Sequence, residues 1–182
     1  DSTQLIQTAA GIYESAIKGI PGKTYTLLVT IGTQEYSAVS QMPLPVSINH
    51  VYLSEMTMGS ETEQHVNVVY HDPIEAGNYY RFVQYINGTK EKQVYTRNDD
   101  LSNGRLTTAS LFTHDGELKK GDVVKVELQS IDVDVYKYWY SVDRGADGGG
   151  SASPANPITN LSGGALGYFS AHAVSEKTLV VQ

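Results

Sequence analysis

The five histidines of this chain, at positions 50, 65, 71, 114 and 172, are the side chains best suited to proton transfer or metal binding near neutral pH. They are spread over predicted strands and turns, and no two have the i, i+4 spacing of a helical zinc site. No serine lies in a Gly-x-Ser-x-Gly elbow, and the absence of cysteine excludes thiolate zinc sites, cysteine nucleophiles and disulfides. The sequence therefore predicts no catalytic, metal or cofactor site, and we expect a protein that is not an enzyme.

Two loops have residue types that suit ion binding. Gly163, Gly164 and Gly167 have the glycine content of a phosphate loop, but the residues that follow are typical of a strand, whereas a phosphate loop leads into a helix. Asn98, Asp99 and Asp100, with Asn103, group oxygen ligands as a calcium site does, without the alternate spacing of an EF-hand. A solvated turn is favoured, and calcium binding by this loop stays open.

The strongest candidate for a binding surface is one face of the predicted strand 79–86. Tyr80, Phe82 and Ile86 alternate with Tyr79, Arg81, Val83 and Tyr85, so the first set is expected to face the core. The second set, in particular Tyr79, Arg81 and Tyr85, forms either a cross-strand ladder that stabilises the sheet or a recognition surface. The ladder is favoured, since such pairs stabilise sheets in any protein.

The charge and hydrophobicity of the chain limit the classes of partner that it can bind. The 182 residues include 20 acidic and 13 basic residues, a formal net charge of -7, and no basic run longer than Lys119-Lys120. Nucleic acid is excluded as a partner, because phosphate binding needs a basic stripe. No apolar stretch approaches the roughly 20 residues of a membrane-spanning helix, so the chain itself is expected to be soluble.

The pattern along the chain is that of an antiparallel β-protein. Thirteen tyrosines against three phenylalanines, alternating segments such as 123–129, and the hairpin signal Asn87-Gly88 all favour strands. The prolines of Met42-Pro43-Leu44-Pro45-Val46 mark a domain boundary. We expect residues 1–42 to be the terminal strands of a small N-terminal β-domain whose opening strands are missing, and 43–182 to be the main domain.

One segment departs from this pattern. Val135, Tyr138, Trp139 and Val142 share a helical face in residues 132–143, and Ser130 or Asp132 is placed to cap the helix. The fold prediction is therefore mainly β, an antiparallel β-sandwich, immunoglobulin-like or related, with one short packed helix near 132–143.

Several segments together resemble the Bacteroidota family known as domain of unknown function 4249, expected to be outer-membrane lipoproteins. The resemblance covers nearly the whole chain and is most specific in its last quarter; its motifs are Gly22-Lys-Thr-Tyr-Thr-Leu, Pro43-Leu-Pro45, Asp72-Pro with Gly77-Asn-Tyr-Tyr-Arg-Phe, Gly121-Asp-Val-Val-Lys-Val-Glu-Leu, Tyr136-Lys-Tyr-Trp139, and Asn156-Pro-Ile-Thr-Asn-Leu-Ser-Gly-Gly-Ala-Leu-Gly-Tyr-Phe169. It implies a lipid anchor in a Gram-negative envelope, often beside a TonB-dependent outer-membrane transporter. It implies no catalytic residues, and the family's lipobox cysteine is not in this sequence.

Three functions follow from these observations. The leading hypothesis is a non-enzymatic envelope lipoprotein ectodomain that captures a ligand or docks with a TonB-dependent transporter. The alternative is a structural or adhesive surface module that binds glycan or protein. A hydrolase is the least supported, because no catalytic constellation was found.

Overall fold

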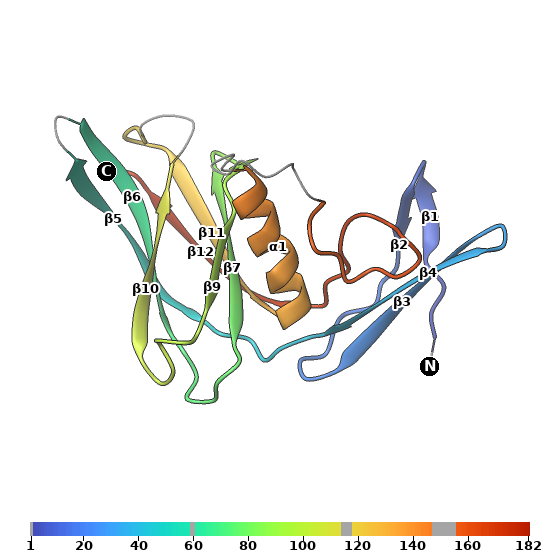
Figure 1. Cartoon of the computed structure of the whole chain (residues 1–182). Helices are drawn as coiled ribbons and strands as arrows, with labels where there is room; N and C mark the ends of the chain where they lie inside the picture. Colours follow the sequence, from blue (N-terminus) through green and yellow to red (C-terminus); the bar gives the residue numbers. More distant parts are fainter. Residues whose placement is uncertain (1, 59–60, 114–117, 147–155) are drawn as a thin grey trace.

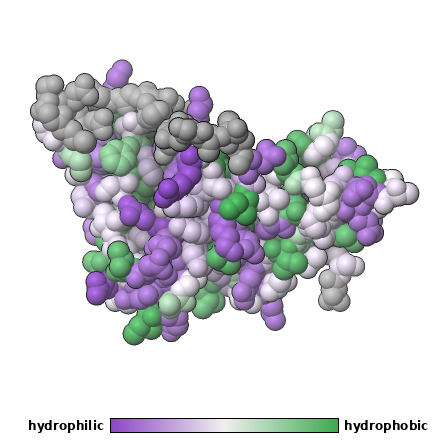
Figure 2. All heavy atoms as spheres, viewed as in Figure 1, coloured by the Kyte–Doolittle hydropathy of each residue, from purple (hydrophilic) through white to green (hydrophobic). Residues whose placement is uncertain are grey.

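The computed structural model describes residues 2–58, 61–113, 118–146 and 156–182. The chain begins with two separate hairpins (Figure 1). The first pairs β1 (Ile6–Ala9) with β2 (Ile12–Glu14), and the second pairs β3 (Thr24–Ile31) with β4 (Gln34–Gln41). Their apolar side chains are largely exposed, for example Ile6, Leu28 and Ile31, and green hydrophobic residues lie among polar ones at this end of the molecule in Figure 2.

The rest of the chain forms two antiparallel sheets. The three-stranded sheet has the order β10 (Leu106–Phe112), β6 (Glu61–His71), β5 (Ile48–Met58). In the five-stranded sheet, β12 (Ala173–Val180), β11 (Val123–Ile131), β7 (Tyr79–Ile86) and β8 (Thr89–Lys90) are neighbours, and β9 (Tyr95–Asn98) also pairs with β7. The prediction of a mainly β, antiparallel sandwich is confirmed.

The core lies between these sheets, and strand alternation explains its composition. On β7 the buried Tyr80 and Phe82 point inward, and on β11 Val124, Val126 and Leu128 do the same. They meet inward side chains of the opposite sheet, such as Val66, Val68 and Tyr70 of β6, with Tyr70 and Tyr80 in an edge-to-face contact at 5.1 Å between ring centroids. Because apolar side chains alternate with other residues along each strand, they all point to one side and form an apolar layer between the two sheets.

Glycine and asparagine form the turn that the sequence indicated between β7 and β8. Asn87 has φ 50° and Gly88 has φ 81°, the left-handed conformations of a tight hairpin turn. Asn87 Nδ2 also donates to Asp122 Oδ1 at 2.9 Å, and its Oδ1 accepts from Val123 N at 2.9 Å. The turn is therefore fixed to the start of β11 as well as to its own hairpin.

The predicted helix is present as α1 (Val133–Ala146). It lies beside β7 and β9, on the side of the five-stranded sheet that faces away from the three-stranded sheet (Figure 1). Residues 156–172, which we call the joint segment, then run from the helix side to the N-terminal hairpins and back to β12 (Figure 1). Among the described residues, no helix is long and apolar enough to cross a membrane.

Candidate functional site

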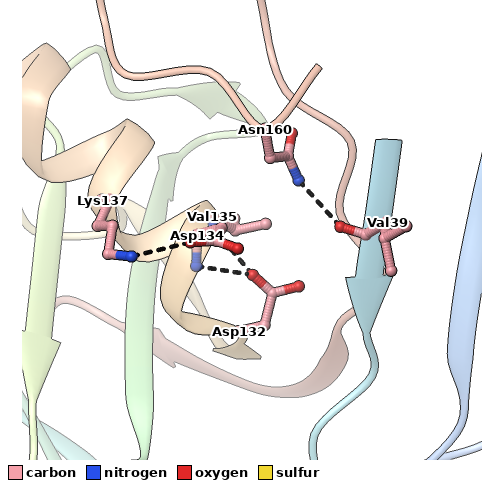
Figure 3. A network of polar contacts seen from close by, with 6 residues as sticks. All are labelled: Val39, Asp132, Asp134, Val135, Lys137 and Asn160. Atoms are coloured by element: carbon pink, nitrogen blue, oxygen red, sulfur yellow. Dashed lines mark hydrogen bonds and ion pairs between the residues drawn. The ribbon is translucent and has the colours of Figure 1, made fainter. Parts of the chain in front are cut away.

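The joint segment ties the β3–β4 hairpin to the sandwich. Leu161 forms an isolated antiparallel bridge with Ala38, and Ser162 N donates to Ser37 O at 2.7 Å. Asn160 Nδ2 reaches Val39 O at 3.4 Å (Figure 3) and Phe169 O at 2.8 Å. Residues of the last quarter of the chain therefore lie along the edge of β4, over 120 positions away in sequence.

Asp132 links the same hairpin to the helix. Its Oδ1 accepts from the backbone amides of Asp134 at 3.0 Å and Val135 at 2.9 Å, which is an N-cap (Figure 3). Its Oδ2 accepts from Ser40 Oγ, and from Gln41 N at 3.2 Å. One carboxylate thus accepts hydrogen bonds from the first amides of α1 and from the end of β4. Asp132, one of the two predicted caps, is confirmed as the cap of the helix.

The three residues predicted as a binding surface lie on the outer face of the five-stranded sheet, partly beneath α1. Tyr79 packs on Tyr136 with ring centroids 4.9 Å apart. Arg81 is only 7% exposed, and its guanidinium carbon lies 3.5 Å from the ring centroid of Trp139. Tyr85 is half-buried, with Lys125 Nζ 4.3 Å from its ring centroid. These side chains are engaged in internal contacts; a ligand-binding role for Tyr79, Arg81 and Tyr85 stays a prediction.

Arg81 and its neighbours form a charged layer under the helix. Arg81 Nη1 donates to Gln129 Oε1 at 3.3 Å, while Glu127 accepts from Lys125 at 2.7 Å and from Gln129 at 3.3 Å. His172 is half-buried near this layer, and its Nδ1 lies 3.0 Å from Ser170 Oγ. Burial, and secondly the positive charge of Arg81, lower the pKa of His172 below 6.5.

This pKa shift predicts an acid-sensitive fold. Below about pH 6.5 the unfolded chain binds a proton at this histidine that the folded chain resists, so stability should fall by at most about 1.4 kcal/mol per pH unit until the folded-state pKa is reached. Urea titrations between pH 5 and 7.5 should show this slope reduced in His172→Gln. The joint variant Ser162→Ala should instead lose stability equally at each pH, and an unchanged slope in His172→Gln would contradict the assignment.

The ion-binding candidates have structural roles. Asp99 is 3% exposed, and its Oδ2 accepts from Asn78 N at 2.8 Å and Asn78 Nδ2 at 3.1 Å, while Asn98 Nδ2 donates to Asp100 Oδ2 at 2.5 Å. The described residues hold no cluster of three or more histidines and acids that is arranged for a metal. His114 lies outside the described residues. The glycines of the joint segment lead to residues 168–172, which are not helical, and the loop contacts β4.

The outer face of the three-stranded sheet has exposed side chains on its flanking strands β10 and β5, whereas His65, Asn67 and Val69 of the central β6 are buried. Figure 1 shows no further strand or helix on this side. At the tip of the β5–β6 hairpin, Glu61 and Glu63 fall in the outward register, but the twelve outward positions nearer the middle of the sheet include no Asp, Glu, Lys or Arg. These positions are Leu106, Thr108, Ser110, Phe112, His65, Asn67, Val69, His71, His50, Tyr52, Ser54 and Met56. We call this surface the uncharged face. It stands out on a chain with 33 charged residues (20 acidic and 13 basic).

A hydrogen-bonded ladder crosses the middle of the uncharged face. Ser110 Oγ of β10 donates to Asn67 Oδ1 of β6 at 2.7 Å, and Asn67 Nδ2 donates to Ser54 Oγ of β5 at 2.7 Å. Asn67 is buried, whereas Ser54 is exposed and Ser110 is half-buried. The ladder orients two hydroxyl groups, and each keeps acceptor capacity toward solvent.

Aromatic rings flank this ladder. Tyr52 is 43% exposed and stacks on His50 with centroids 5.8 Å apart; Phe112 is 42% exposed and meets the edge of His65 at 4.2 Å. Beside Tyr52, a groove of about 650 Å³ opens between β5 and the end of β12. Leu53 and Leu179 line it, together with Gln64, whose buried Oε1 has no hydrogen-bond partner among the described residues.

These features define an antiparallel β-sandwich with one helix, a joint segment and an open, uncharged sheet face. The chain matches the family model described as Domain of unknown function (DUF4249) over residues 1–178, and it therefore belongs to that family. No curated protein and no solved structure matches the chain. The resemblance noted in the sequence is confirmed at the level of the family.

The uncharged face was not identified from the sequence. The sequence signal was the alternation of His65, Asn67 and Val69 with the inward residues of β6, which leaves residues 65–71 of this central strand without an outward Asp, Glu, Lys or Arg. Nothing in the local sequence indicates that Tyr52 and Phe112 lie on the two strands that flank β6. That arrangement depends on strand order, which only the assembled sheet reveals.

Proposed function

We propose that this protein is a non-enzymatic binding ectodomain of a Gram-negative cell envelope, which captures an extracellular ligand on the uncharged face and works beside a TonB-dependent outer-membrane transporter. The observation that supports ligand capture is the combination, on one open sheet face, of two exposed rings with an ordered row of hydroxyl and amide groups. Binding sites typically combine apolar and aromatic surface with a few fixed polar groups.

The envelope location and the transporter are inferred from the family resemblance. Motifs from Gly22 to Phe169 resemble proteins that carry a lipid anchor upstream of such an ectodomain. An anchored module places its binding face in the same membrane plane as a transporter, so a ligand held there is at a high effective concentration near the pore. The joint segment supports this arrangement, because it couples the N-terminal hairpins to the binding sandwich.

The test uses the full-length protein, purified from native membranes through a C-terminal tag. We expect it in the outer-membrane fraction with a TonB-dependent transporter identified by mass spectrometry. Tyr52→Lys should lose the captured ligand but keep the transporter, while the matched surface variant Leu101→Lys, at a 90% exposed position, should keep both. Recovery with neither a transporter nor an extracellular ligand would contradict the proposed function.

A further inference from the structure

The uncharged face has the chemistry of a surface for a neutral sugar polymer. We propose that it binds a neutral, extended carbohydrate chain that crosses the sheet from Phe112 on β10 to Tyr52 on β5 and ends in the groove beside β5. This inference rests on the proposed capture function and names the ligand class.

The two exposed rings lie at the right places for such a chain. Phe112 pairs with His65 in register, and Tyr52 pairs with Asn67, so the rings occupy neighbouring rows on opposite sides of β6. Strands two apart are about 10 Å from one another, comparable with the length of a disaccharide. The C–H faces of sugar rings pack on aromatic faces, whose negative charge density attracts polarised hydrogens. Each ring therefore provides a stacking position for one sugar.

Between the rings, the hydrogen-bonded ladder supplies hydrogen-bond partners for sugar hydroxyl groups. Ser54 accepts one hydrogen bond from Asn67 and Ser110 donates one to it, both at 2.7 Å, so Ser54 can still donate and accept while Ser110 can still accept. Both side chains are fixed by the buried Asn67, and the rings are braced by His50 and His65, so little conformational entropy is lost on binding. The face is thus ordered before the ligand arrives.

The charges around this surface select the ligand, because its outward positions include no Lys or Arg, while Glu63 lies at its end and Glu55 lines the groove. An acidic polymer would gain no cation there, and the chain as a whole carries a net charge of -7. A negatively charged peptide would bury its charges without a counter-charge, which is costly. A neutral polyhydroxylated chain avoids both costs, and the edge of β5, which pairs with no further strand among the described residues, adds backbone donors and acceptors along the groove.

The experiment measures binding of the purified 182-residue chain to polysaccharides by affinity electrophoresis and isothermal titration. The probes are a soluble β-glucan, a mannan and a xylan as neutral polymers, with polygalacturonate as the acidic comparison. We expect saturable binding to at least one neutral polymer, weakened about tenfold by Tyr52→Ala and by Phe112→Ala, and no binding to polygalacturonate. Tyr13→Ala, at a similarly exposed tyrosine of β2, is the matched control and should bind as the parent does.

Circular dichroism and melting curves verify that each variant is folded, and Ser110→Ala gives a second, smaller change on the same face. No binding to any neutral polymer, preference for polygalacturonate, or equal loss in Tyr13→Ala and Tyr52→Ala would overturn the inference. If the transporter still co-purifies in that case, the ligand class is wrong and the envelope role stands. A crosslinker at Tyr52 that captures a protein strand in native membranes would likewise overturn it.

Discussion

Replacing Gly163 with alanine should separate the N-terminal hairpin from the sandwich. Gly163 has φ 76°, and a Cβ at this position would lie 2.6 Å from the Glu35 carbonyl oxygen and 2.9 Å from the Tyr36 ring. Neither neighbour moves easily, since one is backbone and the other is packed beside the joint segment. We expect a loss of about 3 kcal/mol in the free energy of unfolding, the sum of left-handed strain and steric overlap.

Gly164→Ala is the matched control for this change. Gly164 has φ 80°, nearly the same backbone strain, but no heavy atom lies within 4 Å of its added Cβ. It should cost only about 1 kcal/mol, the price of the left-handed conformation. Urea denaturation gives both values, and hydrogen exchange should show the β4 amides exposed in Gly163→Ala alone. Equal effects of the two substitutions would show that the contact with Glu35 does not hold the joint.

Asp132→Ala should be nearly as damaging, because one side chain serves two elements. The substitution removes the helix cap, worth about 1 kcal/mol. It also removes the charged acceptor of Ser40 Oγ and Gln41 N, and hydrogen bonds to charged groups contribute about 1.5 to 3 kcal/mol. Ser40 is 2% exposed, so water does not readily replace the lost partner. We expect a total loss of about 3 kcal/mol and early unfolding of both α1 and β4.

The control for Asp132 lies two residues further on. Asp134 is an exposed first-turn acid that pairs with Lys137 at 2.9 Å, and such surface pairs contribute less than about 1 kcal/mol. Asp134→Ala should therefore lower the melting temperature only slightly. Far-ultraviolet circular dichroism reports the helix, and tryptophan fluorescence of Trp139 reports its packing on Arg81. If Asp132→Ala behaves like Asp134→Ala, the link to Ser40 is not a stabilising contact.

Gly163→Ala and Asp132→Ala both test the contacts that connect the β3–β4 hairpin to the rest of the chain. The predicted boundary at residues 42 and 43 follows the prolines between β4 and β5, and it stays a prediction. The structure adds that Leu161 and Ser162 return to β4 from the far end of the chain. Any attempt to express 43–182 alone therefore leaves the edge contacts of the joint segment without their partner.

Several elements were predictable because their signals are local. The alternation on 123–129 gave β11 and its inward Val124, Val126 and Leu128, and Asn87-Gly88 gave the turn after β7. The apolar stripe of 132–143 gave α1, although the helix continues to Ala146. The residues after Gly167 are typical of a strand, but β12 begins only at Ala173, because the backbone amides of Phe169 and Ala171 donate to Asn160 and Ser40 of the joint region instead.

The sequence by itself determined the fold class, the inward and outward faces of the strands, a helix start at Ser130 or Asp132, and membership in the family. Only the tertiary structure decided which strands are neighbours, and with them that α1 covers Tyr79 and Arg81 while Tyr52 and Phe112 remain open. The reason is physical: periodicity and turn preferences act over a few residues, whereas strand order pairs residues such as Tyr85 and Lys125, 40 positions apart, and the contact of Gly163 with β4 joins segments more than 100 residues apart.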